Sequence, residues 1–245
     1  MRLTVLILDI PLFHAGRRMA PGELCAVTQG LEPGDVLLVA DKLFPLWQLL
    51  VKILCRSDYY HAAVYEGDGQ VIEATTFHPS GKGVVRTEAR QFFSGYKSCC
   101  VLRPPYPSER ARRQALQYAA KQLGKPYDYA LDADSVEAMY CTKLAAGVLR
   151  AGGIDCPPER CLWKTLFTSG NLMSIPGMRR IYGVRPRIAA TLLLQLPFVL
   201  AVSTLSGRYA LIVTVAYIMA GLVQYKFTQR AGYKLYYNDN KSTVV

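Results

Sequence analysis

The histidines and cysteines of this sequence are its candidates for nucleophilic chemistry. There are three histidines, His14, His61 and His78, and seven cysteines. A cysteine thiol has a pKa near ~8.5 and becomes a reactive thiolate when an imidazolium or a helix N-terminus lowers that value. His61 begins an apolar run, HAAVY, where a rigid strand can hold its ring. We therefore expect His61 to be the base that activates a thiol.

Glu73 follows His61 by twelve residues and is the candidate for orienting the imidazole. Residues 61–65 and 70–75 flank the turn-forming sequence Glu-Gly-Asp-Gly, a pattern typical of a β-hairpin. If the loop has three or five residues, positions 61 and 73 face each other directly, with Cβ atoms about 5 Å apart. A carboxylate there fixes one ring nitrogen and leaves the other for a thiol. The structural alternative is a polar cross-strand pair on a solvated face.

Cys141 is the cysteine nearest to a predicted helix start. We expect the helix over residues 140–151, where apolar residues share one face and Gly152-Gly153 ends it. The sequence DSVE at 134–137 resembles a capping box and favours an earlier start. If the helix begins at residue 140, Cys141 lies where a helix N-terminus stabilises a thiolate, and we expect it to be the nucleophile.

The other cysteines give no comparable signal. Their total is odd and their spacing irregular, so we expect a reduced compartment and no disulfide framework. At least one of Cys99 and Cys100, in an apolar run, should be buried. Cys156 and Cys161 lack two further ligands at the spacing that a zinc site needs. The sequence therefore predicts neither a metal nor a cofactor.

Short strands and three helices are expected to make up the domain that positions these residues. The predicted strands cover residues 36–40, 61–65, 70–75, 83–87 and 99–102, and the predicted helices cover 43–55, 108–123 and 140–151. Successive short strands indicate an antiparallel sheet, and the separation of strands from helices indicates an α+β domain. We expect a catalytic domain over residues 31–184, after an irregular N-terminal arm over 1–30.

Residues 188–223 are strongly apolar and contain a single charge, Arg208. The segments 188–205 and 209–223 would span roughly 27 and 22 Å as helices, against a hydrocarbon core of about 30 Å. They predict a C-terminal transmembrane helical hairpin; a buried helical hairpin is the alternative. Basic residues on both sides favour cytoplasmic ends, so we expect a basic cytoplasmic tail over 224–245 and a catalytic domain that faces the cytoplasm.

Three sequence blocks together resemble a known family. They are HAAVYEGDGQVIEA from His61, GKPYDY from Gly124, and YCTKL from Tyr140 with a downstream GGI. In this order they resemble the permuted papain-like cysteine hydrolases of the NlpC superfamily, in the branch of bacterial YiiX and orthopoxvirus relatives. The resemblance covers about residues 31–180 and implies a permuted papain-like fold and a triad of Cys141, His61 and Glu73.

A second group, the lecithin retinol acyltransferases, is more distantly similar. It shares the permuted order and often a hydrophobic C-terminal anchor. That group commonly carries a second histidine where this sequence has Glu73, and an Asn-Cys or similar motif where this one has Tyr140-Cys141. The YiiX-like branch is therefore the better match.

The expected function is acyl transfer from a substrate to Cys141 and then to water or another acceptor. We expect Tyr60, Tyr127 and Tyr140 to bind substrate, although packing is the commoner role of such aromatic residues. A membrane hairpin puts membrane lipids and lipid esters, lipid amides or acylated proteins slightly ahead of peptide amides as substrates. The remaining alternative is a non-catalytic membrane adaptor whose basic surface, within a net charge of +11, holds an anionic partner. No motif supports nucleic-acid binding.

Overall fold

A computed structural model describes residues 19, 21–40, 57, 59–78, 81–96, 98–161, 164–184, 234–236 and 242–244 of the chain. The helices are α2 (Pro21–Gln29), α4 (Ala89–Ser94), α5 (Glu109–Lys121), α6 (Cys141–Ala151) and α7 (Ser169–Met173). The strands are β1 (Val36–Ala40), β2 (His61–Gly67), β3 (Gln70–His78), β4 (Gly81–Glu88), β5 (Ser98–Arg103), β6 (Glu159–Cys161), β7 (Lys164–Leu166), β8 (Arg179–Val184), β9 (Lys234–Tyr236) and β10 (Ser242–Val244).

Eight strands form one antiparallel sheet in the order β10-β9-β8-β5-β1-β2-β3-β4. The five predicted strands form its contiguous half from β5 to β4, and β8, β9 and β10 extend it beyond the prediction. Strands β6 and β7 pair separately. The α+β class with an antiparallel sheet is confirmed.

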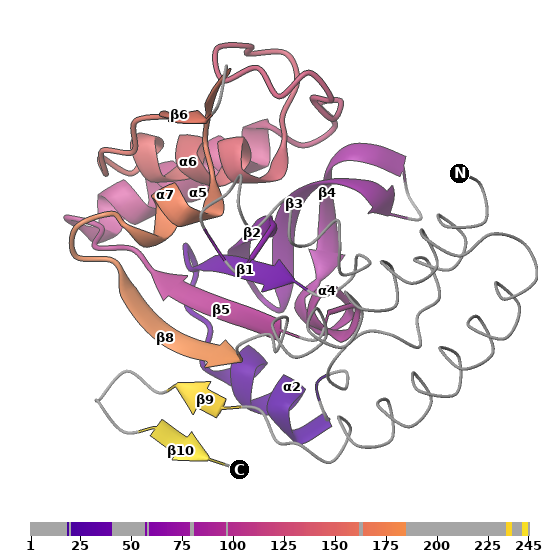
Figure 1. Ribbon diagram of the computed structural model, residues 1–245, viewed down its shortest axis with the longest axis vertical. Coiled ribbons are helices and arrows are strands. Elements are labelled where there is room, and N and C mark those ends of the chain that lie inside the picture. Colours follow the sequence, from indigo (N-terminus) through magenta and orange to yellow (C-terminus); the bar gives the residue numbers. More distant parts are fainter. Residues whose placement is uncertain are drawn as a thin grey trace, which may run out of the picture.

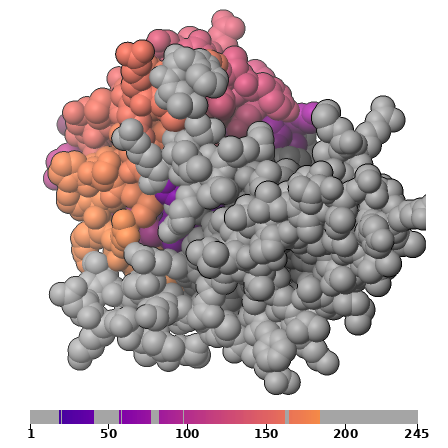
Figure 2. Space-filling model, viewed as in Figure 1, coloured from indigo at the N-terminus to yellow at the C-terminus, as the bar shows by residue number. Residues whose placement is uncertain are grey.

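Helices cover both faces of the sheet, so the domain has three layers (Figure 1). Strand β1 is buried along its whole length, and its residues alternate between the two layers. Leu38 packs in the core beneath α5 and α6, whereas Leu37 packs with residues of α2 and α4. Seen from outside, the pink and orange residues, which include α6, α7 and β8, form the upper left of the molecule (Figure 2).

Helices α5 and α6 pack closely because small residues line their contact. Ser108 caps α5 by accepting a hydrogen bond from the Ala111 N–H at 3.1 Å, as its sequence position predicts. A Cβ atom added at Gly147 of α6 would lie 2.7 Å from the Tyr118 side chain of α5. Glycine at position 147 therefore leaves room for the Tyr118 ring in the contact between α5 and α6.

The hairpin of β2 and β3 differs from the prediction in its register. Its loop has two residues, Asp68 and Gly69, both with positive φ, as a type I′ turn requires. A bulge lies next to this turn, in β2 between Tyr65 and Gly67. Beyond it, the partner of Glu73 in the ladder is Ala63. The predicted direct pairing of positions 61 and 73 is therefore wrong, although the predicted shared face is correct.

Several other predictions fall outside the observed elements or the described residues. Residues 21–29, expected to be irregular, form helix α2, which buries Val27 against the sheet. The helix predicted over 43–55 and the hairpin predicted over 188–223 lie outside the described residues. Within the described residues, no helix is long and apolar enough to cross a bilayer.

Candidate active site

Cys141 is the first residue of α6, as the later of the two predicted starts requires. Tyr140 has extended backbone angles at the N-cap, and the backbone N–H groups of the first turn lie outside the helical hydrogen-bond ladder. The Cys141 side chain is nearly buried, and its Sγ lies 3.9 Å from the Tyr60 carbonyl oxygen. The thiol therefore lies beside the start of β2, in the positive field of a helix N-terminus.

Both neighbours of Cys141 fix the helix start by binding one backbone segment. The Tyr140 hydroxyl accepts a hydrogen bond from the Phe167 N–H at 2.9 Å. The Thr142 hydroxyl donates to the Phe167 carbonyl oxygen at 2.6 Å. Since both polar groups of one peptide residue are engaged, Cys141 is held at a defined distance from the segment between β7 and α7.

A buried lysine fixes the other side of the helix start. The Lys143 Nζ donates to the carbonyl oxygens of Asp132 and Ala138, at 2.6 and 3.0 Å, and forms an ion pair with Asp128 at 3.5 Å. Lys143 and Asp128 are each 5% exposed, so water contributes little to their solvation. This pair anchors the irregular segment 127–139, which contains the second half of the GKPYDY motif.

His61 and Glu73 form a buried hydrogen bond. The His61 Nε2 lies 2.7 Å from Glu73 Oε2, and both residues are at most 8% exposed. They meet diagonally across β2 and β3, since His61 lies two residues before the ladder partner of Glu73. The alternative of a solvated polar pair is excluded by this burial. Because Glu73 engages Nε2, Nδ1 is the ring nitrogen left for the thiol.

Aromatic rings cover the imidazole on the α4 side of the sheet. The Tyr96 ring stacks on His61 with centroids 6.0 Å apart, and the Phe92 ring lies 5.9 Å away. Tyr60 makes an edge contact with Tyr96 at 6.5 Å. This cover keeps water from the His61–Glu73 pair and strengthens its electrostatic interaction.

The electrostatics of the site favour a thiolate and an imidazolium. Burial disfavours the charged imidazole, but hydrogen bonds and charges from Cys141 and Glu73 outweigh it and raise the pKa of His61 to about 10. Burial alone would raise the pKa of Cys141; His61 and the backbone N–H groups of Ala62 and Thr142 lower it below its usual range. Each group thus stabilises the charged form of the other.

A second buried cysteine provides a contrast. Cys156 is fully buried, and its Sγ lies 3.5 Å from Asn171 Oδ1. Burial raises the pKa of Cys156 to about 11, so this thiol stays protonated at neutral pH. The pKa values of the two thiols shift in opposite directions because the His61 imidazole interacts with Cys141, whereas burial dominates at Cys156.

The three tyrosines predicted to bind substrate occupy different environments. Tyr60 is half-buried and precedes His61, so its backbone and ring both border the site. Tyr127 is half-buried and forms an edge contact with Tyr129 at 5.1 Å. Tyr140 is 3% exposed, and its hydroxyl accepts the hydrogen bond from the Phe167 N–H, which is a structural role. Substrate binding by these residues stays a prediction.

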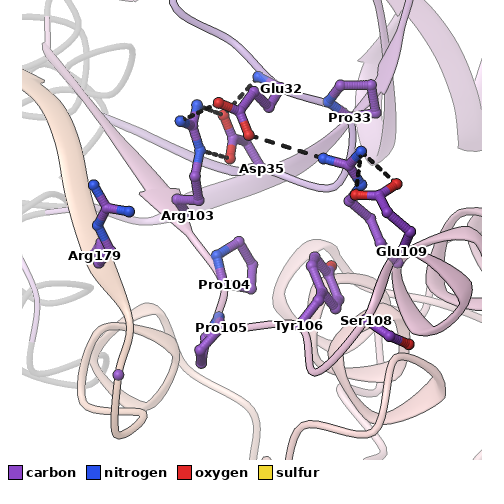
Figure 3. A pocket seen from close by; sticks show the side chains of 12 residues that line it. Glu32, Pro33, Asp35, Arg103, Pro104, Pro105, Tyr106, Ser108, Glu109 and Arg179 are labelled. Carbon is purple, nitrogen blue, oxygen red and sulfur yellow. Dashed lines mark hydrogen bonds and ion pairs between the residues drawn. The ribbon is translucent and has the colours of Figure 1, made fainter.

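A separate cavity of about 280 Å³ lies at the opposite end of the sheet. Arg103 makes two hydrogen bonds of 2.9 Å to the buried Asp35 and one of 2.5 Å to Glu32, as Figure 3 shows. Val36, next to Asp35, pairs with Leu102, whereas Val39 at the other end of β1 pairs with His61. This ion-pair network ties β1 to β5 and does not border the nucleophile.

Two features of the site are not evident in the sequence. Thr87 of β4 donates to Glu73 Oε1 at 2.7 Å, and Lys143 anchors the segment 127–139. Thr87 could be found only with the register of β3 and β4, which shifts at an irregularity between Thr75 and His78. Lys143 lies in the YCTKL block, but lysine in an amphipathic helix usually indicates a solvated face.

Comparisons with known proteins agree with this arrangement. The family model of the permuted papain-like amidase enzymes, YaeF/YiiX, matches residues 30–193. Protein OPG091 of monkeypox virus is 30% identical over 126 residues, which cover 50% of this chain and 70% of the viral protein. Both findings confirm the resemblance to the YiiX and orthopoxvirus branch.

A solved bacterial structure has a similar fold. The crystal structure of YiiX from Escherichia coli O157:H7 matches with a TM-score of 0.51 and 17% identity, covering 61% of this chain and 96% of that one. That protein is described as a metalloprotein. In the described part of this chain, no group of three or more His, Cys, Asp and Glu residues could hold a metal ion. With a family match over more than half of its length, the chain belongs to the permuted papain-like amidases, a family of hydrolases.

Proposed function

We propose that this protein is a cysteine-dependent amidase that works through an acyl-enzyme. Cys141 is the nucleophile, and His61 is the general base and acid. Glu73 orients the imidazole and stabilises its protonated form. The observation that carries this proposal is the buried 2.7 Å hydrogen bond between His61 and Glu73, beside a cysteine at a helix start. An imidazole fixed at one nitrogen is ready to exchange a proton at the other.

The proposed reaction has two halves. The Cys141 thiolate attacks the amide carbonyl carbon, and the tetrahedral intermediate collapses when His61 gives its proton to the leaving nitrogen and the C–N bond breaks. Water then attacks the thioester while His61 takes its proton. The C–S bond breaks, which releases a carboxylic acid and regenerates the thiolate. Glu73 stays ionised and supports the imidazolium throughout.

The N-terminus of α6 provides stabilisation for the oxyanion of both intermediates. As the first residue of the helix, Cys141 has a backbone N–H outside the helical ladder, and the helix dipole places partial positive charge there. Donors aimed at the developing charge typically contribute about 10²–10³ in rate. The bonds that Tyr140 and Thr142 make to Phe167 support this role by fixing the donor in place.

Amides take precedence over lipid esters as the proposed substrate class. The sequence alone favoured lipid acyl groups slightly, but the family of this chain is described as amidases. The apolar stretch over 188–223 still supports a second candidate, hydrolysis or transfer of an acyl group at a membrane surface. We propose that membrane lipids are partners on either view, and that the catalytic domain over 31–184 faces the cytoplasm.

A substrate panel tests this proposal. The full chain in detergent is incubated with peptide amides, N-acyl amides and phospholipid vesicles, and released amine and fatty acid are measured. We expect amine release that disappears in Cys141→Ala and persists in Cys156→Ala. Equal turnover by wild type and Cys141→Ala would contradict the proposed nucleophile. Fatty acid release from phospholipid without amine release would favour the second candidate.

A further inference from the structure

We propose that Thr87 is a positioning residue of the catalytic machinery, which fixes the Glu73 carboxylate for its contact with His61. This inference rests on the proposed function, because it concerns the same site. It extends the chain of polar contacts by one strand: Cys141 on α6, His61 on β2, Glu73 on β3 and Thr87 on β4. No sequence motif of the site includes Thr87.

The geometry of the sheet places Glu73 midway between two donors. Its ladder partners are Ala63 on β2 and Val85 on β4, and its hydrogen-bond partners lie two residues along each strand, His61 before Ala63 and Thr87 after Val85. Strands β2 and β4 run in the same direction, because each is antiparallel to β3. The three side chains therefore form one diagonal line across the same face of the sheet.

Each carboxylate oxygen of Glu73 has its own donor on this diagonal. Oε2 lies 2.7 Å from His61 Nε2, and Oε1 lies 2.7 Å from the Thr87 hydroxyl. With both oxygens held, the carboxylate cannot turn about its terminal bond without breaking a contact. The bond from Thr87 also stabilises the ionised form of Glu73, since a hydroxyl that donates to a carboxylate favours its charge.

Burial makes this second donor important. Thr87 and Glu73 are both 5% exposed, so water does not readily replace a lost hydrogen bond. Among the described residues, His61 bonds to this carboxylate and Tyr96 lies close enough to interact with its charge. Burial raises the pKa of Tyr96, so that its hydroxyl stays neutral. Loss of the Thr87 hydroxyl therefore destabilises the Glu73 anion, which then takes up a proton at higher pH.

Two substitutions separate the hydroxyl from the shape of the side chain. Thr87→Val keeps the branched shape and removes the donor, whereas Thr87→Ser keeps the donor and removes a methyl group. Thr28→Val is the matched control, because the Thr28 hydroxyl of α2 bonds only to carbonyl oxygens of its own helix at Leu24 and Cys25 among the described contacts. Thermal unfolding of each full-length variant establishes that it is folded.

The test measures the rate at which iodoacetamide alkylates Cys141, resolved by peptide mass spectrometry, as a function of pH. The acid limb of this profile is the pH range in which the alkylation rate rises as Cys141 becomes a thiolate. In Thr87→Val we expect the acid limb to move to higher pH by about 0.5–1 unit, so that the rate at a given pH on that limb is three- to tenfold lower. Thr87→Ser and Thr28→Val should keep the wild-type limb. A purely structural role for Thr87 would lower the unfolding temperature without moving the limb.

The outcomes distinguish this inference from the proposed function. If Cys141 of the wild type reacts no faster than the buried Cys156, the proposed function fails. If Cys141 is selectively reactive but Thr87→Val has the wild-type profile, the function stands and the positioning role of Thr87 is overturned. The role is likewise overturned if Thr87→Ser shifts the limb as far as Thr87→Val does.

Discussion

At the scale of single residues, Cys141 and Glu73 together favour the protonated form of His61. The pKa of His61 is raised to about 10, above its usual value of about 6.5, through hydrogen bonds and charges from Cys141 and Glu73. Because this pKa is raised, the imidazolium persists as pH rises and deprotonates near pH 10. If the protein works through the proposed pair of Cys141 and His61, we expect its activity to fall on the alkaline side near that pH.

Glu73→Gln should narrow that window. Glutamine keeps the size of the side chain but lacks one of the two charges that hold the proton on His61, the other being that of Cys141. The pKa of His61 should therefore fall, and the alkaline limb should move below pH 10. We expect alkylation of Cys141 at pH 7 to fall about 10- to 100-fold. Glu66→Gln is the control, because Glu66 lies on the same hairpin and pairs with Arg86 at the surface. An unchanged pH profile in Glu73→Gln would refute the orienting role.

At the scale of elements, local sequence pattern predicts most of the catalytic half of the fold. The apolar run at 36–40 and the capped helix at 108–123 are predictable because burial and capping act on neighbouring residues. The register of the β2–β3 hairpin is not predictable in this way, because a bulge in β2, before the two-residue turn, changes which residues pair. The partners of Glu73 on β4 and the pairing of β8 with β5 depend on contacts between residues distant in sequence, which periodicity does not encode.

The irregular segment 127–139 depends on Lys143, and Lys143→Met should release it. The substitution leaves the Asp128 carboxylate and two carbonyl oxygens buried without their cation. We expect a loss of about 3–5 kcal/mol in the free energy of unfolding, measured by urea denaturation. Lys121→Met on the exposed face of α5 should cost little. Asp128→Asn in the Lys143→Met background should recover part of the loss, and equal stability of the two lysine variants would contradict this role.

At the scale of the whole molecule, strands from both sides of the apolar stretch 188–223 belong to one sheet. Val184 of β8 pairs with Leu235 of β9, and β10 follows at the edge (Figure 1). Strands β8 and β9 would therefore lie on the same side of any membrane that the stretch enters. This arrangement supports the proposal of a hairpin whose two ends lie on one side of a membrane.

Membrane association can be tested by flotation with vesicles of phosphatidylcholine and phosphatidylserine. We expect the full chain to float with the vesicles. Leu193→Arg combined with Leu211→Arg should reduce flotation, because each charge in a hydrocarbon core costs about 2.5–3.5 kcal/mol. Arg110→Glu on α5 changes the charge of the protein without touching the apolar stretch and is the control. A wild-type chain that stays unbound would refute membrane association.

The central claim is that Cys141 is the nucleophile and that His61 activates it. Its most direct test is covalent labelling of the full chain at pH 7 with a thiol-directed electrophile, with every cysteine quantified by mass spectrometry. We predict that Cys141 is labelled first, that His61→Ala reduces its rate to that of an ordinary buried thiol, and that Cys156→Ala leaves it unchanged. Equal total labelling of wild type and Cys141→Ala would contradict the claim.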